Sequence, residues 1–149
     1  MTLIKNIDTM FREALDIMEE LHIEVGTITD VSWNGRLKAV WGRCYYSGKT
    51  GTYRIELNPV LRLPEVSWED AMNTMIHEVL HAYTGRMKHT GEWKRCAEIV
   101  NREYPLYNIT RCTSAEEKGV ADKMNSYYKY IVTCDVCGTV CKYKKQVIL

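Results

Sequence analysis

The segment H-E-V-L-H (77–81) restricts the structure of this chain more than any other part of its sequence. Two histidines four residues apart lie on one face of an α-helix, so both imidazoles can reach the same metal ion if this segment is helical. The surrounding apolar residues recur at helical spacing, and we predict a helix over residues 67–84. Ser67 is placed to cap its start, with an acidic residue three positions later, and Gly85 is placed to end it.

A third histidine, His89, follows eight residues after His81. We expect the chain to turn back after Gly85 and to enter a further helix over residues 90–104, which ends before a proline. Thr90 is the expected cap of that helix. This path brings a third imidazole from a helix start to the two imidazoles of the preceding helix.

Three imidazoles and one water form a tetrahedral zinc site of the kind that hydrolytic enzymes use. Because Glu78 follows the first histidine, its carboxylate can accept a proton from water at the metal and pass it to a leaving amine. The sequence therefore predicts one catalytic Zn²⁺ held by His77, His81 and His89, with Glu78 as the general base. The alternative is a set of surface histidines with a solvated glutamate. The remaining histidine, His22, is interpreted as an ordinary residue at a helix end.

The sequence before residue 67 predicts one helix followed by the three strands of a sheet. Residues 4–21 carry an apolar stripe at helical spacing, and residues 23–31 are rich in β-branched side chains. Residues 37–46 and 52–58 alternate apolar and polar side chains and are joined by a glycine-containing loop, which indicates a hairpin. We therefore expect an α+β fold in which a small, mostly antiparallel three-stranded sheet packs on the N-terminal helix and on the helix over residues 67–84.

Alternation also predicts which side chains face the core. Two sets are each expected to share one face of the sheet: Leu37, Ala39, Trp41 and Tyr45, and then Tyr53, Ile55 and Leu57. We expect the strand near residues 53–58 to be exposed and to bind a substrate by adding a strand to the sheet. Such pairing reads the peptide backbone more than its side chains, so it predicts low sequence specificity.

Composition limits the classes of protein to which this chain can belong. The chain has 149 residues, a formal charge of +1 and 46% hydrophobic residues, which fits one ordinary domain and excludes a disordered protein. It has no apolar run long enough to span a membrane and no export signal at its start, so we expect a cytoplasmic protein with reduced cysteines. Cys44 and Cys96 are then expected to be buried apolar residues. A charge near zero argues against a protein that coats DNA.

The C-terminal segment, residues 126–149, predicts a short hairpin that resembles part of a zinc ribbon. Cys134 and Cys137 form one C-x-x-C knuckle, and Cys141 follows closely. These three could hold a second, structural zinc, with Cys112 as a distant fourth ligand. Because closed structural sites need four ligands and a second knuckle is missing, a hairpin of free thiols is the interpretation that we favour.

Basic and aromatic residues gather in the same segment. They are Lys142, Lys144, Lys145, Tyr127, Tyr128, Tyr130 and Tyr143. Such residues could bind nucleic acid by phosphate contacts and base stacking. We favour the simpler interpretation of a solvated strand with lysine stems lying along it.

The order of motifs resembles the SprT-like family, which includes the Spartan proteases that degrade proteins crosslinked to DNA. The motifs are W-G-R-C (41–44), R-I-E-L-N-P (54–59), H-E-V-L-H-A-Y (77–83), H-T-G-E-W-K (89–94) and the C-x-x-C knuckle (134–137). The H-E-x-x-H pattern alone is shared by many zincins, but its combination with the H-T-G-E-W-K block and a knuckle is more specific. The family usually carries two knuckles, whereas this chain has one.

This resemblance implies a zincin-like metallopeptidase domain over residues 1–125, followed by the partial ribbon over residues 126–149. It implies a zinc-dependent endopeptidase that cleaves protein substrates, with DNA as a further partner and DNA-crosslinked proteins as one substrate class. It assigns the ligand role to His77, His81 and His89 and the acid–base role to Glu78. The alternative is a non-catalytic zinc-binding or nucleic-acid-associated module that keeps the same fold.

Overall fold

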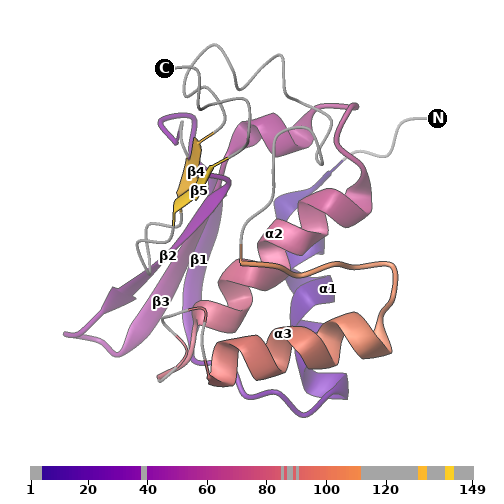
Figure 1. Cartoon of the computed structure of the whole chain (residues 1–149). Helices are drawn as coiled ribbons and strands as arrows, with labels where there is room; N and C mark the ends of the chain where they lie inside the picture. Colours follow the sequence, from indigo (N-terminus) through magenta and orange to yellow (C-terminus); the bar gives the residue numbers. More distant parts are fainter. Residues whose placement is uncertain are drawn as a thin grey trace.

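The computed structural model describes residues 5–37, 40–84, 86, 89 and 91–111, together with the backbone of residues 131–133 and 140–142. Its elements in chain order are α1 (Ile7–Glu20), β1 (Ile28–Trp33), β2 (Gly42–Ser47), β3 (Thr52–Leu57), the 3₁₀ helix η1 (Pro59–Arg62), α2 (Trp68–His81), α3 (Glu92–Glu103), β4 (Ile131–Thr133) and β5 (Val140–Lys142). The three helices lie on one side of the sheet formed by β1, β2 and β3 (Figure 1). This arrangement confirms the predicted α+β class.

The sheet is mixed rather than mostly antiparallel, which corrects the sequence-based prediction. Its strand order is β1-β3-β2, with β3 parallel to β1 and antiparallel to β2. The hairpin β2–β3 forms as expected, but the chain crosses over before it, so that β3 lies between the other two strands. The prediction of an exposed strand over residues 53–58 is therefore wrong, because both edges of β3 are paired. The edge strands of this sheet are β1 and β2.

The register of β2 also differs from the prediction. The buried side chains of β3 are Tyr53, Ile55 and Leu57, as expected. Cys44 lies opposite Ile55 on the core side, whereas Tyr45 lies opposite Arg54 on the other side of the sheet. Tyr45 therefore does not share the core face. The predicted face of β2 is reversed because the strand begins only at Gly42. Trp41, just before it, is buried but does not belong to the alternation of the strand.

A buried asparagine, Asn58, organises the crossover between β1 and β2. Its Nδ2 donates to the carbonyl oxygens of Leu37 and Val40 at 3.0 and 3.1 Å, and its Oδ1 accepts from the amide of Val60 at 2.9 Å. Its own amide donates to the carbonyl of Trp41 at 2.8 Å. One side chain thus satisfies two backbone carbonyls of the connection into β2 and one amide at the start of η1.

The helix α2 lies at the centre of the molecule. The amide of Asp70 donates to Ser67 Oγ at 3.0 Å, which confirms the predicted N-cap. The helix ends at His81, one turn earlier than predicted, and Gly85 is outside the described residues. It ends there because the amide of Ala82 donates to the carbonyl of Val79, and the carbonyl of Ala82 accepts from Gly26 at 2.6 Å instead of continuing the helix.

The helix α3 begins after Gly91, whose φ of 57° is the conformation that favours glycine. Gly91 is therefore the N-cap, and the prediction that Thr90 occupies this position is wrong. The helix ends at Glu103, before Pro105, as expected. Its buried side chains include Cys96, and Cys44 is buried in β2, which confirms both predictions of buried cysteines.

The strands β4 and β5 pair in antiparallel fashion within the predicted C-terminal hairpin. Cys112, Cys134 and Cys137 lie outside the described residues, as do the side chains of Cys141 and Lys142 and the rest of the basic and aromatic cluster. The second zinc, the nucleic-acid contacts and the domain boundary near residue 125 therefore stay predictions. Within the part of the chain that the structure describes, no helix has the length and apolar character needed to cross a membrane.

Candidate metal centre

Three histidines converge at the C-terminal end of α2. His77 and His81 project from one face of that helix, and His89 comes from the connection to α3. The Nε2 atom of His89 lies 2.8 Å from Nε2 of His77 and 3.0 Å from Nε2 of His81. The sequence prediction that these three imidazoles come together is confirmed, and their nitrogens form a group that could hold a metal ion.

Backbone carbonyls select the tautomer of two of these rings. His77 Nδ1 lies 2.9 Å from the carbonyl oxygen of Thr110, and His81 Nδ1 lies 2.8 Å from that of Arg86. A carbonyl oxygen can only accept, so in the neutral ring the proton is on Nδ1 and Nε2 carries the lone pair. Hydrogen bonding of this kind is what orients histidines that bind metals.

Burial keeps two of the rings neutral at physiological pH. Desolvation, opposed by the hydrogen bond to the Arg86 carbonyl and reinforced by the charge of the Arg86 guanidinium, lowers the pKa of His81 to about 4. Desolvation also lowers the pKa of His89 to about 3, with smaller contributions from His81 and Arg111. Neutral imidazole is the form that binds metal, so these rings need lose no proton before they do so.

The donor set fits zinc. Two nitrogens that are each about 2.0–2.1 Å from one tetrahedral ion lie about 3.3 Å apart, close to the separations found here. When all three Nε2 atoms carry lone pairs, these repel one another at such distances, and a shared cation removes that repulsion. Imidazole nitrogen is a preferred ligand of zinc. The arrangement therefore suits a divalent ion held by three neutral histidines.

Trp93 from α3 forms a wall of the site. Its ring centroid lies 4.9 Å from that of His77, 5.6 Å from that of His81 and 4.5 Å from that of His89. Its Nε1 donates to the carbonyl of His77 at 3.3 Å, and the residue is only 2% exposed. Trp93 was not among the predicted site residues. The available signal was its place four residues after His89 on the apolar face of the next helix.

Glu78 lies on a different side of α2, against the edge strand β2. It is 3% exposed, and a Cβ atom placed on Gly42 would lie 3.1 Å from its Cγ. Burial, and then the charge of Glu78, raise the pKa of the Cys44 thiol above its usual range, so this thiol also lies near the carboxylate. Glu78 is not one of the grouped metal-binding residues.

His22 lies apart from this cluster. It directly follows the C-cap of α1, is exposed and has a φ of 57°. This placement agrees with its interpretation as an ordinary residue at a helix end.

Comparison with known families identifies the domain. The model of the SprT-like family matches residues 6–113, which is well over half of the chain, so this chain belongs to the SprT-like family. The match includes all three histidines, Glu78 and Trp93. No curated protein matches the sequence.

Proposed function

We propose that this member of the SprT-like family is a zinc-dependent metallopeptidase that hydrolyses peptide bonds of protein substrates. The observation that carries the proposal is the convergence of three Nε2 atoms at 2.8 and 3.0 Å, with two of the rings oriented by backbone carbonyls. A helix that carries two histidines and an intervening glutamate is typical of zinc peptidases. Family membership supports the same conclusion.

We assign each residue of the site a separate role in the reaction. His77, His81 and His89 would hold the ion, and Trp93 keeps their rings packed and shields them from bulk water. Zinc, when bound, supplies a Lewis acid that polarises the scissile carbonyl and makes water more acidic. The Glu78 carboxylate accepts a proton from the attacking water and delivers it to the leaving amine. Glu78 is buried beside β2, 3% exposed.

The edge strand β2 is where we propose that the substrate backbone binds. Among the described strands, β2 is the edge strand beside Glu78, as the close approach of Gly42 to that side chain shows. An extended peptide that paired with β2 would place its carbonyls near the carboxylate, and backbone pairing predicts low sequence specificity. This replaces the sequence-based assignment of that role to residues 53–58.

DNA is proposed as a further partner, on the strength of the family resemblance. Proteins attached to DNA are then one substrate class. The near-neutral charge of the chain indicates that any such contact is local, because broad phosphate binding needs an excess of basic residues.

The test compares Glu78→Gln with the parent protein on a disordered protein substrate, with and without DNA. We expect cleavage to fall by about 10²–10⁴-fold, because an amide cannot accept the proton, while zinc content stays at the parent value. Glu98→Gln, which makes the same change at an exposed position of α3, is the control and should cleave normally. Equal cleavage by Glu78→Gln and the parent contradicts the proposal. A parent that binds zinc but cleaves nothing under any condition identifies a non-catalytic zinc-binding module instead.

A further inference from the structure

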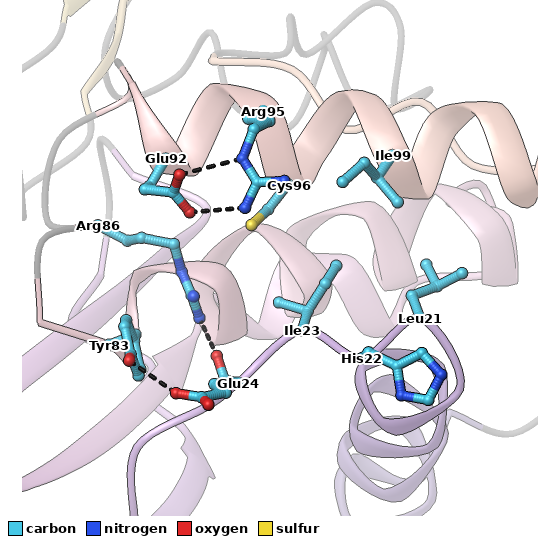
Figure 2. A pocket seen from close by; sticks show the side chains of 10 residues that line it. All are labelled: Leu21, His22, Ile23, Glu24, Tyr83, Arg86, Glu92, Arg95, Cys96 and Ile99. Carbon is cyan, nitrogen blue, oxygen red and sulfur yellow. Dashed lines mark hydrogen bonds and ion pairs between the residues drawn. The ribbon is translucent and has the colours of Figure 1, made fainter.

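A hollow of about 280 Å³ lies where the ends of α1 and α2 meet the start of α3. Figure 2 shows the side chains that line it, among which Arg86 extends from the α2–α3 connection toward the segment that follows α1. Arg86 is only 3% exposed, and burial lowers the pKa of its guanidinium. An arginine so deeply placed is costly unless its hydrogen-bond donors are satisfied.

The guanidinium joins two segments that are distant in sequence. Its Nε donates to the carbonyl oxygen of Leu80 at 2.7 Å, and its Nη2 donates to the carbonyl oxygen of Glu24. The guanidinium carbon lies 4.4 Å from the centre of the Tyr83 ring, and the Tyr83 hydroxyl donates to the Glu24 carboxylate at 2.7 Å (Figure 2). The side chain thus ties the last turn of α2 to the chain after α1.

The backbone of the same residue contacts the metal centre. The carbonyl oxygen of Arg86 accepts from His81 Nδ1 at 2.8 Å, and His89 follows three residues later in the chain. The amide of Arg86 donates to the carbonyl of Tyr83 at 3.0 Å, which fixes the turn that leaves α2. Anchoring the side chain of Arg86 therefore fixes both the acceptor that orients one ligand and the start of the segment that carries another.

We propose that Arg86 is a positioning residue of the metal centre, whose buried guanidinium holds the carbonyl that orients His81 and the segment that delivers His89. This inference rests on the proposed function, namely that the three histidines bind zinc. Arg86 does not supply a ligand. Loss of its anchor leaves all three imidazoles present but lets the carbonyl and the connecting segment move, so the bound ion is held less tightly.

The test measures how fast zinc leaves the folded protein in excess chelator. Arg86→Met keeps the apolar stem but removes the donors. We expect zinc to leave about 10–100-fold faster, because losing a group that orients a ligand typically lowers metal affinity by about that factor. Arg95→Met is the matched control. It removes another arginine that lines the same hollow, but one that is exposed and pairs with Glu92, so its rate should stay within about twofold of the parent.

A second measurement separates positioning from a general loss of stability. Co²⁺ replaces zinc in the folded proteins, and its visible absorption reports the arrangement of the ligands. We expect an altered spectrum for Arg86→Met and the parent spectrum for Arg95→Met. If Arg86→Met does not fold, Arg86→Lys carries the test, because a single amine cannot replace the planar fork that spans two carbonyls. We expect Arg86→Lys to lose zinc several-fold faster than the parent.

An unchanged rate and spectrum in a folded Arg86 variant would overturn the proposal while leaving the zinc site intact. A parent protein that binds neither zinc nor Co²⁺ at the histidines would instead overturn the proposed function on which this inference rests. The two failures are therefore distinguishable in the same set of proteins.

Discussion

Replacing Gly42 with alanine tests how closely β2 must approach α2. A Cβ atom at this position would lie 2.9 Å from Leu57 Cδ2, 3.1 Å from the carbonyl oxygen of Glu56 and 3.1 Å from Glu78 Cγ. All three distances are shorter than an ordinary van der Waals contact. The Glu56 carbonyl belongs to the central strand and cannot rotate away, so either β2 or the Glu78 side chain must move.

The size of the effect follows from this crowding. Overpacking a buried site typically costs about 1–3 kcal/mol, and we expect the free energy of unfolding of Gly42→Ala to fall by that amount. We also expect peptide cleavage to decrease while zinc content is unchanged, because the crowded atom belongs to Glu78 and not to a histidine. Chemical denaturation of the zinc-loaded protein and a cleavage assay give the two values.

Gly35→Ala is the matched control, because no atom lies within 4 Å of a Cβ built there. Alanine at an unstrained position tends to be neutral or to stabilise by up to about 1 kcal/mol. The reasoning is refuted if Gly42→Ala is as stable and as active as Gly35→Ala, since β2 would then not lie against Glu78 as described.

Three further predictions concern other parts of the chain. Asn58→Ala should lower the free energy of unfolding by about 3 kcal/mol, because it removes three side-chain hydrogen bonds of about 1 kcal/mol each. Urea denaturation measures this free energy, and a loss below about 1 kcal/mol would contradict the prediction. Burial and the charge of Glu13 raise the pKa of Tyr107 to about 12, against about 10 in the unfolded chain. The stability that Tyr107 contributes is therefore present below pH 10 and is lost as the pH rises toward 12. Tyr107→Phe should show a weaker loss of stability over that range, and equal losses in both proteins would count against this assignment. Cys134→Ser combined with Cys137→Ser should leave the zinc of the histidine site in place, as elemental analysis would show, whereas loss of all metal and unfolding would mean that the C-terminal hairpin is integral to the domain.

Local sequence signals predicted the parts of the fold that depend on neighbours along the chain. The cap at Ser67, the helical spacing of His77 and His81 and the alternation of β3 all follow from contacts within a few residues, and the structure contains each of them. Strand order could not be predicted in this way. Whether β3 lies at an edge depends on where β1 docks, and that is decided by pairing between segments about 25 residues apart.

The prediction of which side chains of β2 face the core was wrong for a related reason. Alternation gives the correct period, but a strand that begins one residue later presents the opposite set of side chains to the core. Trp41 is apolar and buried, but it precedes Gly42, the first residue of the strand. Counting Trp41 as a strand position assigned Tyr45 to the core, although Tyr45 lies on the other side of the sheet.

The histidines of the candidate site could be predicted because metal ligands are side chains with a recognisable spacing. Their orientation could not, because the carbonyls of Arg86 and Thr110 are backbone groups that every residue carries. Trp93 and the Arg86 guanidinium are intermediate cases. Their residue types are visible in the sequence, but the long-range contacts that give them a role exist only in the folded chain.

Anomalous X-ray scattering at the zinc absorption edge, from crystals of zinc-replete protein, shows where the metal binds. We predict one peak within about 2.0–2.1 Å of the Nε2 atoms of His77, His81 and His89 together. Data collected below the edge should lose that peak, which identifies the element. A peak bound elsewhere, or no peak beside histidines that have moved apart, would contradict the metal site and the hydrolytic function built on it.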